Sequence, residues 1–374
     1  MNILQICANY PPVASGYGVY AQNLSLGLLK YGVNTTVLTF NPINISPDEI
    51  KDKLPVKRIN AFVLNSIEYP LYNPTILNHI NNIIKENDIN IINSHTRFFT
   101  SSFFAALYKK LNKSVLLVHT EHGAGPLVHK SGYVSSICNL YDSTFGKWAI
   151  KSADIPIAIG PSSMNFMRKL GCENEIEIIP NSINCTEFEN SSKLVSKNQS
   201  EKIIITYIGR LVESKGVSDL IRVFSEIENY YDVKLWIVGD GPDELKLREL
   251  VQSLQIRNIE FLGFRTDIAN ILSMTNIFVN PSHYDSVPTT ILEAGCLGTR
   301  IVATNVGDVS YIIGDNYPYL YDVGSLTLLK DHLIQIIEES DFRADNLKRR
   351  IHQMFNWNIN SKKYLDLVSS HISS

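Results

Sequence analysis

Regularly spaced cysteines are missing from this sequence. The chain has five cysteines, which lie far apart, and no Cys-x-x-Cys pair occurs. They are Cys7, Cys138, Cys172, Cys185 and Cys296. This distribution argues against a disulfide framework and against a zinc ribbon, and it favours a reducing compartment.

Long apolar runs and an excess of basic charge are also missing. No run reaches the roughly 18 apolar residues that a membrane-spanning helix needs, and the start, MNILQICANYPP, lacks the basic segment of a secretory signal. Lys and Arg number 34 against 37 Asp and Glu, for a net charge of -3. We therefore expect a cytoplasmic protein without a nucleic-acid partner, which touches a membrane at most peripherally, at its inner face.

Several motifs that carry well-defined chemistry are absent as well. The sequence has no Gly-x4-Gly-Lys-Ser/Thr phosphate loop, no His-Glu-x-x-His pair and no Gly-x-Ser-x-Gly elbow. It also has no Asp-x-Asp pair that would hold a nucleotide through a metal ion. These absences argue against a P-loop nucleotidase, a zinc protease and an α/β-hydrolase.

What the sequence does contain is an alternation of short β-branched runs with helical patterns. The runs predict strands at 2–8, 35–40, 61–64, 89–93, 115–120, 155–159, 176–179, 203–209, 233–238, 259–262, 277–280 and 300–303. The helical patterns lie at 19–31, 74–86, 100–111, 216–230, 243–254, 289–297, 326–338 and 358–370. This alternation predicts an α/β fold with two Rossmann-like, doubly wound domains, each built on a buried parallel sheet.

A polar stretch interrupts the alternation and marks the domain boundary. Residues 187–202, EFENSSKLVSKNQSEK, contain few large apolar side chains, so they read as a linker between domains at 1–186 and 203–352. The last segment, 353–374, is expected to form a helix that packs back on the first domain. Two open α/β domains imply a cleft between them, with ligands at the carboxyl ends of the strands.

Two glycines, Gly16 and Gly18, follow the first predicted strand. Gly16-Tyr17-Gly18-Val19-Tyr20-Ala21 fits the Gly-x-Gly-x-x-Ala dinucleotide fingerprint, but the preceding loop is long and contains two prolines. The second strand also lacks an acidic residue for a ribose hydroxyl, which makes a nicotinamide oxidoreductase the least favoured function. Either the loop amides face a phosphate or sugar, or the glycines form a plain turn.

Histidines lie near the ends of two further strands of the first half. His122 follows the strand that ends near Thr120, His119 lies within that strand, and His95 follows the preceding one. A histidine at such a position can bind a sugar hydroxyl or relay a proton. For each position taken alone, a solvated loop histidine is the favoured interpretation.

Two cations flank a turn directly after the first strand of the second half. Arg210 and Lys215 stand in Gly209-Arg210-Leu211-Val212-Glu213-Ser214-Lys215-Gly216, just before a predicted helix. Both side chains can converge on one anion beside the helix N-terminus, an arrangement that suits a departing diphosphate. The alternative is two unrelated surface cations.

A second loop runs from Asp285 into a predicted helix that carries Glu293. Pro288 fits the first turn of that helix. The amides of Val287, Thr289 and Thr290 can point at a phosphate or sugar oxygen, and Glu293 can accept bonds from a ribose diol. Beside the two cations this segment suits a nucleotide diphosphate; by itself it is a helix N-terminus with a nearby acid.

Taken in order along the chain, these segments resemble the retaining glycosyltransferases of family 4, which have the two-domain GT-B fold. The matching segments are Gly16-Tyr17-Gly18, Thr120-Glu121-His122-Gly123, Ile179-Pro180-Asn181-Ser182-Ile183-Asn184, Gly209-Arg210 with Lys215-Gly216, Val238-Gly239-Asp240-Gly241-Pro242, Phe261-Leu262-Gly263-Phe264, the stretch from Asp285 to Glu293, and Ala303-Thr304-Asn305-Val306-Gly307. The family usually has Glu where Asp285 stands and Gly where Ser182 stands. The shorter Asp285 side chain puts its contact with the donor sugar in doubt.

The resemblance implies a role for each matching residue. Arg210 and Lys215 would bind the donor diphosphate, and Glu293 the donor ribose. His122 would touch the transferred sugar, with His119 in its place if the strand register is shifted. The other implied donor contacts are Gly16, Gly18, Phe264, Arg265, Asp285, Ser286, Val287, Pro288, Thr289 and Thr290.

The implied reaction moves a sugar from a UDP- or GDP-linked donor to a hydroxyl of a carbohydrate or lipid-linked saccharide, with retention of configuration. No metal or other cofactor is expected, because two cations and a helix end serve the phosphates. The high Asn, Ile and Lys content suggests an AT-rich bacterial genome, so surface polysaccharide synthesis is the expected setting. A nucleotide-sugar epimerase and a non-catalytic sugar-nucleotide binding protein are the alternatives.

A small basic cluster follows an aromatic-rich helical pattern and consists of Lys109, Lys110 and Lys113. It is either a lipid contact or a solvated helix end.

Overall fold

The computed structural model describes residues 1–13, 15–41, 46–64, 69–126, 131–192, 202–339 and 344–373. The chain divides into two compact units. Met1–Asn181 and Trp357–Ser374 form the first, and Ser182–Asn356 form the second. Each unit is described by itself.

The first unit is built on an eight-stranded sheet with the order β10-β9-β8-β7-β1-β2-β4-β3. Its strands are β1 (Asn2–Ile6), β2 (Asn34–Phe40), β3 (Asp48–Lys51), β4 (Leu54–Ile59), β7 (Ile91–His95), β8 (Leu116–Glu121), β9 (Ile155–Ala158) and β10 (Glu177–Ile178). All neighbours run parallel except β3, which is antiparallel to β4. Strands β5 (Phe62–Leu64) and β6 (Tyr69–Leu71) pair antiparallel in a separate two-stranded sheet. The strand order reverses at β1, between β7 and β2, which makes this a doubly wound sheet.

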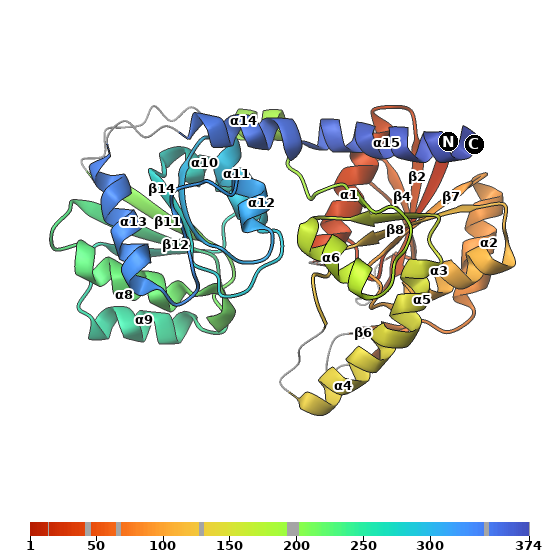
Figure 1. The fold of residues 1–374 in the computed structure, drawn as a ribbon, viewed down its shortest axis with the longest axis horizontal. Helices are drawn as coiled ribbons and strands as arrows, with labels where there is room; N and C mark the ends of the chain where they lie inside the picture. The colour runs from red at the N-terminus through yellow and green to blue at the C-terminus, as the bar shows by residue number, and fades with distance from the viewer. Residues whose placement is uncertain are drawn as a thin grey trace. The chain divides into compact units, whose positions relative to one another are not determined.

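Helices cover the first sheet through a core of aliphatic and aromatic side chains. The helices of this unit are α1 (Gly16–Leu29), α2 (Ile76–Glu86), α3 (Thr100–Leu111), α4 (Gly132–Tyr141), the π-helix η1 (Asp142–Gly146), α5 (Lys147–Lys151), α6 (Pro161–Lys169) and α15 (Trp357–Ser373). Helix α4 is mostly exposed and buries only Cys138. Helices α2 and α3 share a core cluster with β1, β2, β7 and β8. The last helix, α15, packs along α1, as Figure 1 shows in blue beside red. The Trp357 and Tyr20 rings meet edge to face, with centroids 5.0 Å apart.

The second unit is built on a six-stranded parallel sheet with the order β13-β12-β11-β14-β15-β16. The strands are β11 (Ile203–Ile208), β12 (Val233–Val238), β13 (Ile259–Gly263), β14 (Ile277–Asn280), β15 (Arg300–Thr304) and β16 (Leu320–Tyr321). In chain order this arrangement is 3-2-1-4-5-6, the strand order of nucleotide-binding Rossmann folds. The order reverses between β11 and β14, so these two strands define the switch point.

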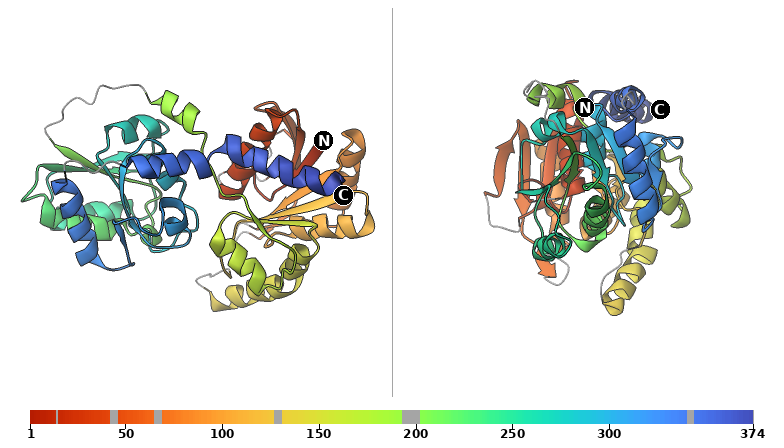
Figure 2. Two further views of the ribbon diagram at one scale, coloured as in Figure 1. Left: turned by 45° about the horizontal axis from the view of Figure 1, so that its top comes forward. Right: turned by 90° about the vertical axis from the view of Figure 1, so that its left-hand side faces the viewer.

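Two core clusters lie on opposite faces of the second sheet. One holds side chains of α8 (Val217–Ile227), α9 (Glu244–Ser253) and α13 (Leu326–Glu338). The other holds side chains of α10 (Ile268–Met274), α11 (Thr289–Cys296), α12 (Val309–Ile313) and α14 (Asp345–Met354). Figure 2 shows these helices around the sheet. The predicted pair of doubly wound, Rossmann-like α/β domains is confirmed.

Several predicted bounds differ from the structure. The sequence pattern missed β3, β4 and β6, and it missed α4, α6, α10, α12 and α14. It also assigned 187–202 to a linker, whereas α7 (Cys185–Ser191) continues as helix into that range. The partly buried Phe188 anchors this helix on the second core cluster, which a count of polar residues overlooked. Residues 193–201 of the predicted linker lie outside the described residues.

Candidate functional site

The switch point of the second unit brings together the two loops that the sequence singled out. One loop follows β11 and contains Arg210, the 3-10 turn η2 (Glu213–Lys215) and the left-handed Gly216. The other follows β14 and runs from Pro281 to Pro288. The Ser214 carbonyl accepts hydrogen bonds from the amides of His283 and Tyr284, at 2.9 Å and 3.3 Å. These backbone bonds hold the two loops against each other.

Gly216 is needed where the two loops touch. Its φ is 65°, in the left-handed region, and a Cβ built on it would lie 2.0 Å from the Pro281 carbonyl oxygen. Any other residue would clash with backbone that cannot move away. The glycine at this position therefore has a structural reason that is independent of any ligand.

Lys215 and Asp285 form an ion pair between the two loops. The Lys215 ammonium contacts Asp285 Oδ2, and the two side chains are 28% and 17% exposed. Asp285 Oδ1 accepts a hydrogen bond from the Ser286 amide at 3.0 Å. Both carboxylate oxygens of Asp285 therefore have partners. Asp285, which stands where the family usually has Glu, binds Lys215, one of the two cations predicted to contact the phosphates.

The segment after Asp285 leads into α11 with free amides. Ser286 is held by the turn after β15, because its carbonyl accepts the Asp308 amide at 2.9 Å. Helix α11 begins at Thr289, one residue later than the predicted first turn at Pro288, which is instead the N-cap. Within the described residues no acceptor is found for the amides of Val287, Thr289 and Thr290. These amides form the positive end of the helix, where an anion is stabilised.

Glu293 is a half-buried acid of this region. It lies in α11, and its Oε2 atom is buried without a hydrogen-bond partner. Burial raises the pKa of this carboxyl from 4.5 to about 7. A buried carboxylate oxygen without a donor is costly, so Glu293 is suited to accept hydrogen bonds from hydroxyl groups that are not part of the chain.

The other residues predicted for this end of the sheet are more exposed. Arg210 is exposed and has no ion-pair partner among the described residues, so its guanidinium can reach an incoming anion. Phe264, directly after β13, is 71% exposed. Arg265 forms a bidentate ion pair with Asp267, in which its Nε and a terminal guanidinium nitrogen each lie 2.8 Å from a carboxylate oxygen. The structure thus brings Lys215 and Asp285 into contact, whereas Arg265 is engaged locally.

In the first unit, buried side chains at the ends of β1, β7 and β8 form a chain of hydrogen bonds. His95 Nε2 lies 2.8 Å from Gln5 Oε1, and His95 Nδ1 lies 3.1 Å from His122 Nε2. Because Gln5 Oε1 only accepts, His95 carries its proton on Nε2 and His122 donates from its own Nε2. His122 Nδ1 is therefore left as an acceptor, which suits a sugar hydroxyl.

Burial keeps this histidine pair neutral. It lowers the pKa of His122 to about 3, and it lowers the pKa of His95 well below the ordinary histidine value. Tyr20 packs edge to face on His122 with ring centroids 4.9 Å apart. At neutral pH the uncharged His122 ring can consequently accept a hydrogen bond from a hydroxyl, but it cannot act as a general acid, because the imidazolium form is absent. His119, the alternative position, makes different contacts: its Nδ1 lies 2.9 Å from Ser94 Oγ and its Nε2 lies 3.4 Å from Glu121 Oε2.

Sequence reasoning missed the buried acid and arginine that fix the His122 loop. Arg97 donates to Glu121 Oε1 and to Asp142 Oδ2, both at 2.9 Å, and all three side chains are buried. Glu121 Oε1 also accepts the Gly123 amide, at 2.6 Å. Burial raises the pKa of Glu121, but the adjacent guanidinium outweighs it and the net shift is downward. The available signal was an acid at the end of a strand, two positions before a glycine.

The two glycines of the first loop have structural roles of different kinds. Ser15 caps α1 and its Oγ accepts the Gly18 amide at 3.2 Å. A Cβ on Gly18 would lie 2.5 Å from the Asn9 carbonyl oxygen, so a larger residue does not fit. The Gly18 amide is therefore not available to a phosphate in this conformation. Gly16 is exposed and open, and its predicted role stays a prediction.

A helix that crosses a bilayer must be both long and apolar. In the part of the chain that the structure describes, none combines the two to the degree that crossing a bilayer requires.

Comparison with known proteins gives these sites a context. Residues 189–353 match the model of "Glycosyl transferases group 1", and residues 14–187 match that of "Glycosyltransferase Family 4". N-acetyl-alpha-D-glucosaminyl L-malate synthase of Bacillus anthracis is 27% identical over 350 residues, covering 90% of this chain and 88% of that protein.

Two solved structures share the fold over the whole chain. Sucrose-phosphate synthase of Thermosynechococcus elongatus superposes with a TM-score of 0.81 at 18% identity, covering 100% of this chain and 99% of the other. HepE of Anabaena, solved in complex with UDP, gives 0.78 at 16% identity, covering 99% and 100%. The architecture is GT-B, and the two family models adjoin within α7. The chain belongs to the glycosyltransferases of group 1.

Proposed function

We propose that this glycosyltransferase takes its sugar from a UDP- or GDP-linked donor that binds at the β11–β14 switch point. The observation that carries the proposal is the Lys215–Asp285 ion pair between the two loops at that point. It puts an ammonium group at the carboxyl ends of the strands where Rossmann folds bind nucleotides. The exposed Arg210 on the same loop supplies a second cation.

The donor would be held by three kinds of group. Arg210 and Lys215 contact the diphosphate, and the free amides at the start of α11 add hydrogen bonds to phosphate or sugar oxygens. Glu293 accepts from the ribose hydroxyls, which would satisfy its buried oxygen. The UDP in the structure of HepE supports a nucleoside diphosphate as the ligand class.

In the first unit His122 would accept a hydrogen bond from a hydroxyl of the transferred sugar. Its Nδ1 atom is an acceptor because the Gln5–His95 chain fixes the protons of both imidazoles. The low pKa of His122 rules out a role as the proton donor near neutral pH. The Arg97–Glu121 pair holds the loop in place and does not itself contact substrate.

The chemistry would proceed with retention of configuration. The bond from the anomeric carbon to the diphosphate breaks, and a bond to the acceptor oxygen forms on the same face. The acceptor proton passes to the departing phosphate oxygen. Arg210 and Lys215 stabilise the negative charge that grows on the diphosphate, and loss of one such contact costs about 2–4 kcal/mol in the barrier. The chain's own cations serve the phosphates, so the proposed chemistry uses no metal.

The acceptor is proposed as a carbohydrate or lipid-linked saccharide, in bacterial surface polysaccharide or glycoconjugate synthesis at the cytoplasmic face. The name of the B. anthracis relative supports a role in glycoconjugate synthesis. Two of the three lysines for which a lipid contact and a solvated helix end were the alternatives have partners within the chain. Lys109 pairs with Asp154 at 2.7 Å, and Lys110 lies 5.9 Å from the centroid of the Trp148 ring.

The test is a thermal-shift screen of UDP-, GDP- and ADP-sugars, followed by turnover with the donor that binds. A bound ligand raises the unfolding temperature of the folded chain. Transfer to an added acceptor, with the anomer of the product read by NMR, supports the proposal. An isomeric sugar nucleotide formed from donor alone would indicate an epimerase, and binding without turnover on a broad acceptor panel would indicate a binding protein; either overturns it.

A further inference from the structure

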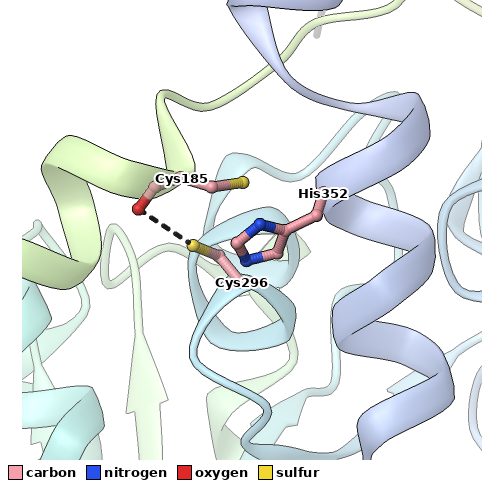
Figure 3. Close-up of side chains that lie close together, drawn as sticks. All are labelled: Cys185, Cys296 and His352. Carbon is pink, nitrogen blue, oxygen red and sulfur yellow. Dashed lines mark hydrogen bonds between the residues drawn. The ribbon is translucent and has the colours of Figure 1, made fainter.

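Two cysteines and a histidine meet in the second unit, away from the β11–β14 loops. Cys185 is the first residue of α7, Cys296 is the last residue of α11, and His352 lies in the last turn of α14. Their potential ligand atoms all lie within 4.8 Å of one another. Figure 3 shows the two sulfur atoms and the imidazole turned toward one another from three separate helices.

The imidazole of this cluster lacks a hydrogen bond where it is buried. His352 Nε2 is buried without a hydrogen-bond partner. Glu189 Oε1 lies 3.3 Å away, and the carboxylate is itself paired with Lys348 at 2.7 Å. Both cysteine side chains are fully buried. The Cys296 thiol has one long contact, 3.6 Å to the Cys185 carbonyl oxygen. A buried ring nitrogen without a hydrogen bond, beside two thiols and a carboxylate oxygen, is a set of donors that a ligand could satisfy.

The donor set has the composition of a zinc site. Thiolate sulfur and imidazole nitrogen are the ligands that Zn²⁺ favours in structural sites, where it has four ligands in a tetrahedron. Sulfur atoms on such an ion are about 3.8 Å apart, and the ligand atoms of this cluster lie within 4.8 Å of one another, so these side chains need to approach by at most about 1 Å. Nitrogen and oxygen ligands are about 3.3 Å apart, which is the separation of His352 Nε2 and Glu189 Oε1.

The charges around the cluster also balance. Zn²⁺ with two thiolates, a neutral imidazole and the Glu189 carboxylate has a net charge of −1. The Lys348 ammonium beside Glu189 offsets that charge, in the manner of the outer groups that support metal ligands. Binding would release the two thiol protons to solvent.

We propose that Cys185, Cys296 and His352 bind a structural zinc ion, with Glu189 as the nearest group for the fourth position. The ion would fasten α7, α11 and α14 to one another. Helix α7 begins just after the chain enters the second unit at Ser182, and α14 ends just before it leaves at Asn356. Ile183 and Phe355 already join these two segments, through an amide-to-carbonyl bond of 2.9 Å.

This zinc site is independent of the proposed donor site. Cys296 ends α11 at its C-terminus, whereas the amides assigned to the donor lie at its N-terminus. The wide spacing of the cysteines argued against a zinc ribbon, and that argument holds only for ligands that are close in sequence. Cys185 and Cys296 are 111 positions apart, and only the fold brings them together.

The test measures metal bound to the full-length chain. Purified protein is stripped with chelator, dialysed and titrated with Zn²⁺ alone, and bound zinc is counted by mass spectrometry. We expect one zinc per chain, and a loss of affinity of about tenfold or more in Cys296→Ser and His352→Ala. Cys172→Ser, which removes a buried cysteine of the first unit, is the matched control and should bind zinc normally.

A second measurement needs no variant, in case the substitutions prevent folding. Co²⁺ added to the stripped wild-type chain should give the visible absorption of tetrahedral cobalt with a thiolate charge-transfer band, and Zn²⁺ should abolish it. A chain that takes up neither metal at one equivalent overturns the proposal. So does zinc binding that is equally strong in wild type and in Cys296→Ser, because the ion would then lie elsewhere.

Discussion

Lys215 and Asp285 pair across the two loops of the β11–β14 switch point, although 70 positions separate them in the sequence. The pair has a chemical consequence for the proposed donor site. A diphosphate must compete with Asp285 for the ammonium group, or share it. Asp285 therefore either orients Lys215 toward the donor or weakens its attraction, and the two cases give different kinetics.

The first prediction concerns this pair. We expect Lys215→Ala to lower kcat/KM for the donor by about a hundredfold, because a contact to developing charge is lost. Asp285→Asn should cost less, because the ammonium group remains. The double variant should be no worse than Lys215→Ala alone, because both residues act through one group. Losses that simply add would show that Asp285 has a separate contact with substrate.

Arg210 offers a cleaner test, because it has no ion pair among the described residues. Arg210→Ala should lower kcat by about 10²–10³ while the unfolding temperature stays within a degree or two of wild type. Arg222→Ala, which removes an exposed arginine of α8, is the matched control and should retain normal turnover. Near-normal turnover in Arg210→Ala would reject its assignment to the diphosphate.

The bounds of the elements show where sequence patterns succeed. Strands 233–238 and 277–280 and helix 326–338 agree with β12, β14 and α13 residue for residue. Strand β14 is an apolar run that ends in Asn280, β12 is apolar except for Lys234, and α13 has a regular apolar face, so local pattern and burial agree. Strand β4, LPVKRI, was missed because its burial alternates and it contains Pro55 and two basic residues.

Contacts that depend on the register of distant strands had no local signal. Gln5 and His95 are 90 positions apart, and nothing in either segment indicates the hydrogen bond that sets the histidine protons. The different partners of His122 and His119, which are His95 and Ser94, likewise depend on strands that are distant in the sequence. Lys215 and Asp285 were both singled out, but their ion pair was not.

His122 gives a prediction about pH. Because burial lowers its pKa to about 3, the imidazole is neutral throughout the range from pH 5 to 8. We therefore expect that titration of His122 causes no change in the kcat of the wild type between pH 5 and pH 8. His122→Asn, which keeps a hydrogen-bonding group, should retain more activity than His122→Phe, measured as kcat at saturating donor. A change of kcat near pH 6 that is present in the wild type and absent from both variants would contradict the conclusion that His122 is neutral.

The Arg97–Glu121 pair predicts a large effect on stability. Glu121→Gln leaves the Arg97 guanidinium buried with only Asp142 opposite its charge, and breaking such a buried pair costs about 3–5 kcal/mol in the free energy of unfolding. Urea unfolding followed by circular dichroism measures this difference. Glu173→Gln breaks an exposed pair with Lys151 and should change stability by less than about 1 kcal/mol. Equal effects would show that burial does not set the energy of these pairs.

Glu293 predicts a stability that falls as pH rises. Burial raises its pKa from 4.5 to about 7, so between these values the unfolded chain has lost a proton that the folded chain keeps. Ionisation of the unfolded chain then favours unfolding, and the protein should lose up to about 3 kcal/mol between pH 4.5 and pH 7 on account of this group.

Glu293→Gln should remove that pH dependence, because an amide does not ionise. In urea unfolding at pH 5 and pH 7.5, the variant should gain stability over wild type only at the higher pH. The same change should raise the KM for the donor, because the ribose hydroxyls would lose an anionic acceptor. Addition of the donor should restore the stability of the wild type at pH 7.5 more than that of Glu293→Gln. Equal restoration in the two proteins would separate Glu293 from the ribose, and the buried carboxyl would then need another partner.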